Sequence, residues 1–204
     1  MFNSGFISSM NGDEDIYDNT IENIQLPSEF SYMKNLPKVL NQGSEQICVP
    51  CSLSAYFEYK ISLLSKHIQN SKFDLYDIFN SRTIKTDGMS IKEAIDYTIH
   101  TGAKYSSGVI KANKYYAVKS IFALRHAIVT NGPCIICLPV YDEYNTEFWT
   151  PNDELKGYHA VAVVGYDDNG FIIRNSWGSD YGYNGYAHIS NNDIKKSKEI
   201  WTIC

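Results

Sequence analysis

Apolar residues recur every three or four positions after Cys48, and this spacing predicts a long helix with one buried stripe that runs to about Gln69. The stripe consists of Leu53, Phe57, Ile61, Leu64 and Ile68. Pro50 is compatible with such a helix only in the first turn, where its missing N–H would have had no intrahelical partner. We therefore place the start of the helix at about Cys48.

Two further helices are predicted in the first two thirds of the chain. Ser90 is suited to an N-cap because Glu93 follows it three residues later, and the helix that it starts should end at Gly102. A weaker helical pattern covers residues 118–130.

The later part of the chain changes to short apolar or alternating runs, which predict strands. These runs cover residues 134–140, 159–166, 171–175 and 186–189. The sequence Asp167-Asp-Asn-Gly170 between two of them is typical of a hairpin turn. Because a helix-rich part precedes a strand-rich part, the pattern indicates an α+β fold in two lobes.

The opening of the chain lacks this periodicity. Residues 1–20 are polar and acidic, so we expect a flexible tail there and a single folded unit over 21–204. Within this unit we expect a helical lobe over about 38–125 and a β lobe over about 126–204, with 21–37 packing across the β lobe.

Composition and charge limit the classes of partner. The chain has 204 residues, of which 44% are hydrophobic, and a net charge of -5 with scattered basic residues. We expect no nucleic-acid partner, because no basic patch is present. The sequence contains no apolar run long enough to span a membrane, and we expect no signal peptide because residues 1–15 lack a basic start and an apolar stretch. We expect a monomer in the cytoplasm or in an assembly such as a virion.

Cysteine spacing leaves a metal site as an alternative. The chain has two Cys-x-x-Cys pairs, Cys48 with Cys51 and Cys134 with Cys137, which could supply four thiolates to zinc. The second pair lies in an apolar run that reads as a strand, where residues three apart face opposite ways. We therefore favour core packing for this pair and expect neither a metal nor another cofactor.

Three residues have the chemistry of nucleophilic catalysis. A thiol at a helix N-terminus and beside an imidazolium has a lowered pKa, and Cys48 has the first of these surroundings. His159 begins a predicted strand, so its ring can project into a cleft. Asn175, at the end of the next strand, could hold the imidazole in one tautomer.

The sequence blocks around these residues resemble the papain family of cysteine peptidases, in the order in which the family has them. The blocks are Asn41-Gln-Gly-Ser44 with Cys48, Gly157-Tyr-His-Ala-Val-Ala-Val-Val-Gly-Tyr166, Ile173-Arg-Asn-Ser-Trp-Gly178 and Gly182-Tyr-Asn-Gly-Tyr186. The resemblance implies a papain-like fold in which the helix of Cys48 belongs to one lobe and an antiparallel sheet carries His159 and Asn175 in the other. It also implies hydrolysis of polypeptide substrates through a thioester intermediate.

The same resemblance implies further site residues. Gln42, six positions before Cys48, corresponds to the glutamine of the oxyanion hole, and Trp177 to an aromatic residue that covers the histidine–asparagine hydrogen bond. Gly88 resembles a glycine that pairs with the substrate backbone. Cys137 and Ala160 resemble residues lining the pocket for the side chain two before the scissile bond.

Departures from the family pattern leave alternatives open. Val49 and Pro50 follow the nucleophile where an aromatic residue is usual, and Glu45 replaces a disulfide cysteine. Cys51 is a rival nucleophile, and residues 1–20 could lie in the cleft as a short inhibitor. The alternative functions are a catalytically silent papain-fold protein that serves as a binding or structural component, for example of a viral particle or a toxin, and acyl transfer to an amine.

Overall fold

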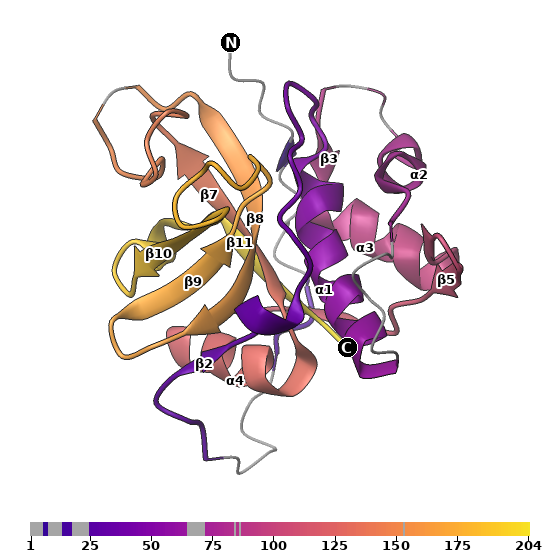
Figure 1. The fold of residues 1–204 in the computed structure, drawn as a ribbon, viewed down its shortest axis with the longest axis horizontal. Coiled ribbons are helices and arrows are strands. Elements are labelled where there is room, and N and C mark those ends of the chain that lie inside the picture. The colour runs from indigo at the N-terminus through magenta and orange to yellow at the C-terminus, as the bar shows by residue number, and fades with distance from the viewer. Residues whose placement is uncertain are drawn as a thin grey trace.

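The protein consists of two lobes that stand side by side, one mainly helical and the other built on a sheet (Figure 1). The predicted α+β class is confirmed, because helices and an antiparallel sheet form separate lobes. The structure is a computed structural model, and it describes residues 6–7, 14–17, 25–64, 72–83, 85, 87–152 and 154–204.

The helical lobe is organised around α1, which spans Cys48–Leu64. The backbone N–H of Cys51 donates to the carbonyl of Ile47 at 3.0 Å, so the helix begins at Cys48 with Pro50 in its first turn, as predicted. The predicted end near Gln69 lies outside the described residues. The other elements of this lobe are α2 (Leu75–Asn80), β3 (Met89–Ser90), α3 (Ile91–His100), β4 (Ala103–Tyr105) and β5 (Gly108–Ile110).

Serine side chains fix the starts of two helices. The hydroxyl of Ser90 accepts from the backbone N–H of Glu93 at 3.2 Å, which confirms the predicted N-cap of α3. The hydroxyl of Ser120 accepts from the N–H of Ala123 at 3.0 Å and caps α4, which spans Ile121–Asn131. This helix begins three residues later than predicted, because Ser120 has an extended backbone.

A seven-stranded antiparallel sheet forms the second lobe. Its strands run in the order β10-β9-β8-β7-β11-β6, and β2 also pairs with β8. The strands are β2 (Phe30–Ser31), β6 (Tyr115–Ala117), β7 (Cys134–Val140), β8 (Gly157–Tyr166), β9 (Gly170–Arg174), β10 (Tyr186–Ser190) and β11 (Glu199–Ile203). The described residues also include the short 3-10 helices η1 (Met33–Asn35) and η3 (Ile194–Lys196). The predicted strands β7 to β10 are therefore confirmed, whereas β2, β6 and β11 were not predicted.

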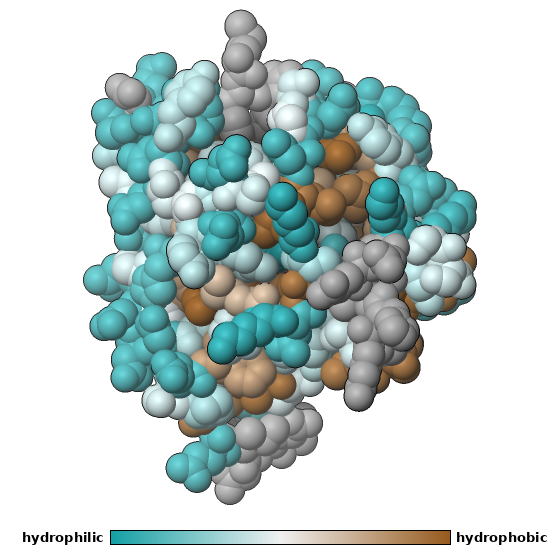
Figure 2. Space-filling model, in the orientation of Figure 1, coloured by the Kyte–Doolittle hydropathy of each residue, from teal (hydrophilic) through white to brown (hydrophobic). Residues whose placement is uncertain are grey.

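The sheet separates two apolar cores, and β7 contributes to both. Cys134 lies in the core that includes α4, and Cys137 lies in the core that includes α1. The two thiols thus face opposite ways, as expected for residues three apart on a strand. Polar residues cover most of the surface in this view, and apolar surface is visible near the boundary between the lobes (Figure 2).

Two described stretches near the N-terminus pair with the body of the protein. The two residues of β1 (Phe6–Ile7) run parallel to β3 in the helical lobe, and β1 also lies near β8 of the sheet. Farther along, Ile16 bridges to Ala117 of β6. Within the described residues, no helix has the length and apolar character that crossing a membrane requires.

Candidate active site

The loop before α1 is hydrogen-bonded to the loop after β9, and this pairing joins the two lobes. The N–H of Gln42 donates to the carbonyl of Ser176 at 2.8 Å, and the N–H of Gly178 donates to the carbonyl of Leu40 at 2.9 Å. The residues just before the helix of Cys48 are therefore fixed against those just after Asn175.

His159 and Asn175 are in direct contact. His159 is near the start of β8, Asn175 directly follows β9, and the histidine Nε2 lies 2.7 Å from the asparagine Oδ1. The same oxygen accepts from the backbone N–H of Ser176 at 2.7 Å. Since Oδ1 is an acceptor, the contact assigns the ring proton of neutral His159 to Nε2.

Aromatic side chains enclose this pair. The indole of Trp177 stacks on the imidazole of His159 with ring centroids 4.8 Å apart and planes at 23°. Phe148 meets the imidazole edge-on at 5.6 Å, and Tyr181 packs against Trp177 at 5.3 Å. The hydrogen bond between His159 and Asn175 is therefore held in a medium of low dielectric, where it is stronger than in water.

Burial also governs the charge of the histidine. Desolvation lowers the pKa of His159 from 6.5 to about 4, while the hydrogen bond to Asn175 acts in the opposite direction. His159 is 1% exposed, so water cannot solvate an imidazolium in this arrangement. The imidazole is therefore neutral at neutral pH as long as the site stays covered.

Gln42 lies where the loop before α1 meets the loop after β9, and both the oxygen and the nitrogen of its side-chain amide are hydrogen-bonded. Its Oε1 accepts from the hydroxyl of Ser176, and its Nε2 donates to the carbonyl of Glu45 at 2.7 Å. A primary amide nitrogen carries two hydrogens. One donor of Gln42 is thus used by Glu45, and the other can serve a ligand.

Cys48 is the first residue of α1 and is fully buried. It belongs to the same apolar core as Ala160, the neighbour of His159, and Cys137 of β7. Helix α1 packs directly on β8, which brings the start of the helix to the strand of His159. A helix start leaves its first N–H groups outside the hydrogen-bond ladder, so they can bind an anion.

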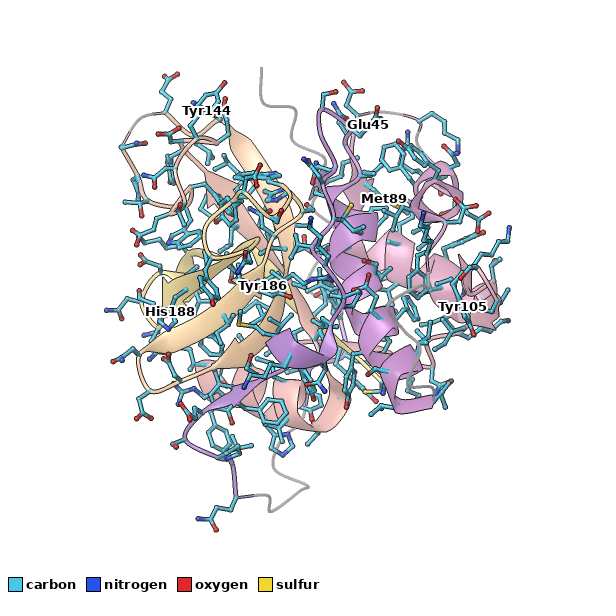
Figure 3. All side chains as sticks on the ribbon, viewed as in Figure 1. Glu45, Met89, Tyr105, Tyr144, Tyr186 and His188 are labelled. Atoms are coloured by element: carbon cyan, nitrogen blue, oxygen red, sulfur yellow. The ribbon has the colours of Figure 1, made fainter. Side chains whose placement is uncertain are left out.

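The remaining predicted residues occupy both sides of the same boundary. Gly88 has a φ of +95° and directly precedes β3 in the helical lobe. Cys137 and Ala160 are directly opposite each other on β7 and β8. In Figure 3, Glu45 and Met89 mark the helical lobe at the end of the boundary where Tyr144 marks the other lobe. The N-terminal strand β1 pairs with Met89 at this point.

Several residues of the site were not identified from the sequence. Ser176 positions Gln42, Phe148 contacts His159, and Tyr181 packs behind Phe148 and Trp177. Ser176 could have been identified from the sequence, because it is part of the Asn175-Ser-Trp-Gly178 block. No sequence pattern pointed to Phe148, because it lies in a loop between β7 and β8 outside every predicted element. In the described part of the chain, no three His, Cys, Asp or Glu side chains form a metal-binding group.

A protein-family comparison matches most of the chain. The family described as papain family cysteine protease matches residues 44–201. A cathepsin B-like CP1 of Giardia intestinalis is 35% identical over 109 residues, which are 46% of this chain and 35% of that protein. Falcipain-3 of Plasmodium falciparum is 27% identical over 189 residues, which are 81% of this chain and 35% of that protein. The chain spans about a third of the length of these two relatives.

Solved structures share the fold. Xylellain, a cysteine protease from Xylella fastidiosa, has a TM-score of 0.80 and 21% identity, and the match covers 98% of this chain and 95% of xylellain. A procathepsin B from Trypanosoma congolense has a TM-score of 0.79 and 14% identity, with 98% and 85% of the two chains covered. At these identities the likeness concerns the fold, and it confirms the papain-like class that the sequence resemblance implied.

Proposed function

We propose that this chain, which belongs to the papain family of cysteine proteases, hydrolyses peptide bonds with Cys48 as nucleophile and His159 as acid and base. The observation that carries the proposal is the covered hydrogen bond between His159 Nε2 and Asn175 Oδ1, 2.7 Å long, on the strand against which the helix of Cys48 packs. Asn175 fixes the tautomer, so Nδ1 is the ring nitrogen that exchanges protons.

In the proposed mechanism, the sulfur of Cys48 attacks the carbonyl carbon of a polypeptide substrate after its proton has passed to His159 Nδ1. The second donor of Gln42 and the N–H of Cys48 hold the oxyanion of the tetrahedral intermediate. His159 then protonates the leaving amine. Water, deprotonated by the same imidazole, hydrolyses the thioester and releases the acid.

We further propose that substrate lies along the boundary between the lobes. Gly88 and β3 would pair with its backbone, and Cys137 and Ala160 would line the pocket for the side chain two before the scissile bond. Support for this placement comes from the position of Gly88 directly before β3, whose backbone pairs with the short strand β1, and from the direct pairing of Cys137 with Ala160.

The test is labelling with an epoxysuccinyl peptide, which alkylates activated cysteine thiolates, followed by peptide mapping. We expect one label at Cys48 in the wild type and in Cys51→Ala, and none in Cys48→Ala. The wild type and Cys51→Ala should also hydrolyse fluorogenic peptides, and Cys48→Ala should not. Labelling of Cys51 would identify Cys51, and not Cys48, as the nucleophile. The absence of both labelling and hydrolysis would favour the catalytically silent binding or structural protein.

The oxyanion role of Gln42 has its own matched control. Gln42→Ala should lower kcat by about 10²–10³-fold, because one donor to the oxyanion is lost. Ser176→Ala removes the hydroxyl that holds Gln42 but leaves that donor in place, so its effect should be much smaller. Equal effects of the two substitutions would indicate that Gln42 only supports the loop.

A further inference from the structure

Cys51 is a buried thiol one turn away from the proposed nucleophile, and the mechanism does not use it. Cys48 and Cys51 lie in the first turn of α1 with Pro50 between them, and Cys51 is 5% exposed. Residues three apart on a helix share a face, so both thiols point to the same side. Burial raises the pKa of the Cys51 thiol, and the nearby sulfur of Cys48 raises it further.

Helix geometry satisfies the spacing that a disulfide requires. With a radius of about 2.3 Å and a rise of about 1.5 Å per residue, Cα atoms three residues apart are separated by about 5 Å. Disulfides join Cα atoms about 4.4–6.8 Å apart. A Cys-x-x-Cys sequence at a helix N-terminus is also the arrangement in which dithiols exchange readily, because the first sulfur is a stabilised thiolate.

We propose that Cys48 and Cys51 form a reversible disulfide, which makes this pair an oxidative modification site that switches the peptidase off. The loss of activity rests on the proposed role of Cys48 as nucleophile, whereas formation of the bond does not. The oxidant is hydrogen peroxide, and the reductant class is a small or protein dithiol.

The chemistry balances in two steps. The Cys48 thiolate attacks one peroxide oxygen, the O–O bond breaks, and the departing hydroxide takes a proton, which leaves a sulfenic acid and water. The sulfur of Cys51 then attacks the sulfenic sulfur, the S–O bond breaks, and the proton of Cys51 leaves with the hydroxide as a second water. Two thiols lose two electrons to one peroxide, and a dithiol returns them by exchange.

Cys137 is the competing partner, because it shares a core with Cys48 and the sulfur of Cys48 contributes to its raised pKa, after burial and Glu199. Cys137 belongs to β7 in the other lobe, so its distance from Cys48 depends on the relative position of the two lobes. The distance from Cys48 to Cys51 is fixed by one helical turn. We therefore assign the disulfide to Cys51.

The experiment treats the full chain with hydrogen peroxide, blocks remaining thiols and maps tryptic peptides without reduction. Cleavage after Lys38 and Lys60 yields one peptide that contains both Cys48 and Cys51 and no other cysteine. The proposal predicts that this peptide is unblocked and about 2 Da lighter, since two hydrogens are lost. After reduction with dithiothreitol, both cysteines of this peptide should react with the blocking reagent again, and the protein should again hydrolyse peptides.

Variants separate the possible outcomes. In Cys51→Ala, peroxide should leave Cys48 with two or three oxygens, and dithiothreitol should fail to restore labelling, because no thiol competes with further oxidation. Cys134→Ala, on the opposite face of β7, should behave like the wild type. A bond between Cys48 and Cys137, or an oxygenated Cys48 beside a blocked Cys51 in the wild type, would overturn the proposal. Peptide mapping detects the disulfide whether or not the protein is active. A protein that forms the disulfide but hydrolyses no peptide would therefore refute the proposed peptidase function and leave the disulfide proposal standing.

Discussion

The carboxylate of Glu58 lies 2.6 Å from the guanidinium of Arg174, and both side chains are buried. Glu58 is in the middle of α1, and Arg174 is the last residue of β9, directly before Asn175. Arg174 also donates to the carbonyls of Pro37 and Lys38, at 3.1 and 3.3 Å. The ion pair therefore joins the helix of the proposed nucleophile to the strand that places the third member of the proposed triad.

Glu58→Gln should destabilise the protein strongly, because it leaves the charge of Arg174 buried without a counter-ion. Breaking such a pair costs about 3–5 kcal/mol. We also expect kcat to fall, since the pair anchors Arg174, the residue directly before Asn175, to α1. Urea denaturation and peptide hydrolysis measure the two effects.

An exposed ion pair offers the control for this prediction. Glu143 pairs with Lys156 at 2.9 Å, and the lysine side chain is 37% exposed. Glu143→Gln should cost less than about 1 kcal/mol, because solvent screens the pair. If Glu58→Gln costs no more than Glu143→Gln, the buried pair does not hold the lobes together.

Trp177→Ala should lower kcat/KM by about tenfold, equivalent to about 1.4 kcal/mol, because water then competes for the hydrogen bond between His159 and Asn175. Trp177→Phe keeps an aromatic ring over the imidazole and should retain most of the activity. Steady-state kinetics with one peptide substrate compares the two. A similar loss of kcat/KM in both variants would mean that the indole does not act by shielding the hydrogen bond from water.

Local patterns predicted much of this fold. The stripe after Cys48, the cap at Ser90 and the apolar run 134–140 correspond to α1, α3 and β7. Each of these elements has a period or a cap that is visible within a few residues. By contrast, β6 and β11 were missed, because short runs such as Tyr115–Ala117 become strands only by pairing with partners distant in the sequence.

The candidate site shows the same division. Gln42, His159, Asn175 and Trp177 stand in sequence blocks with a distinctive context, and the structure brings them together. The ion pair of Glu58 and Arg174 spans 116 positions, and Phe148 reaches His159 from a loop. No local pattern contains such contacts, because they depend on how two lobes pack.

The depressed pKa of His159 should make stability depend on pH. Between pH 6.5 and about 4, the unfolded chain binds a proton at this residue and the folded protein does not, so stability falls as the pH falls through this window. The slope is about 1.4 kcal/mol per pH unit. From pH 7 to pH 5, the wild type should therefore lose about 2 kcal/mol more than His159→Gln, which has no such proton.

Urea denaturation of both proteins at the two pH values provides the measurement, and the difference between them cancels the other titrating groups. Glutamine was chosen because its side-chain amide carries an N–H donor, as His159 does toward Asn175. Identical pH dependence in the two proteins would show that His159 titrates normally, with water in reach of its ring.

Deletion of residues 1–9 should speed the alkylation of Cys48. The strand β1 runs parallel to β3 and lies near β8, and this is where the proposed substrate would pair. Cys48 and His159 are 0% and 1% exposed in this arrangement, so a substrate must displace whatever covers them. The deletion should also raise the pKa of His159, because water then reaches the imidazole.

The second N-terminal contact supplies the control for this deletion. The backbone N–H of Ala117 donates to the carbonyl of Asp15 at 2.8 Å, and the hydroxyl of Tyr17 contacts Thr130 at 2.9 Å. Tyr17→Phe weakens this anchor and leaves β1 intact, so alkylation by an epoxysuccinyl peptide should stay close to the wild-type rate. Equal rates in the deletion and the wild type would mean that β1 leaves the nucleophile accessible and that the burial of Cys48 comes from the lobes themselves.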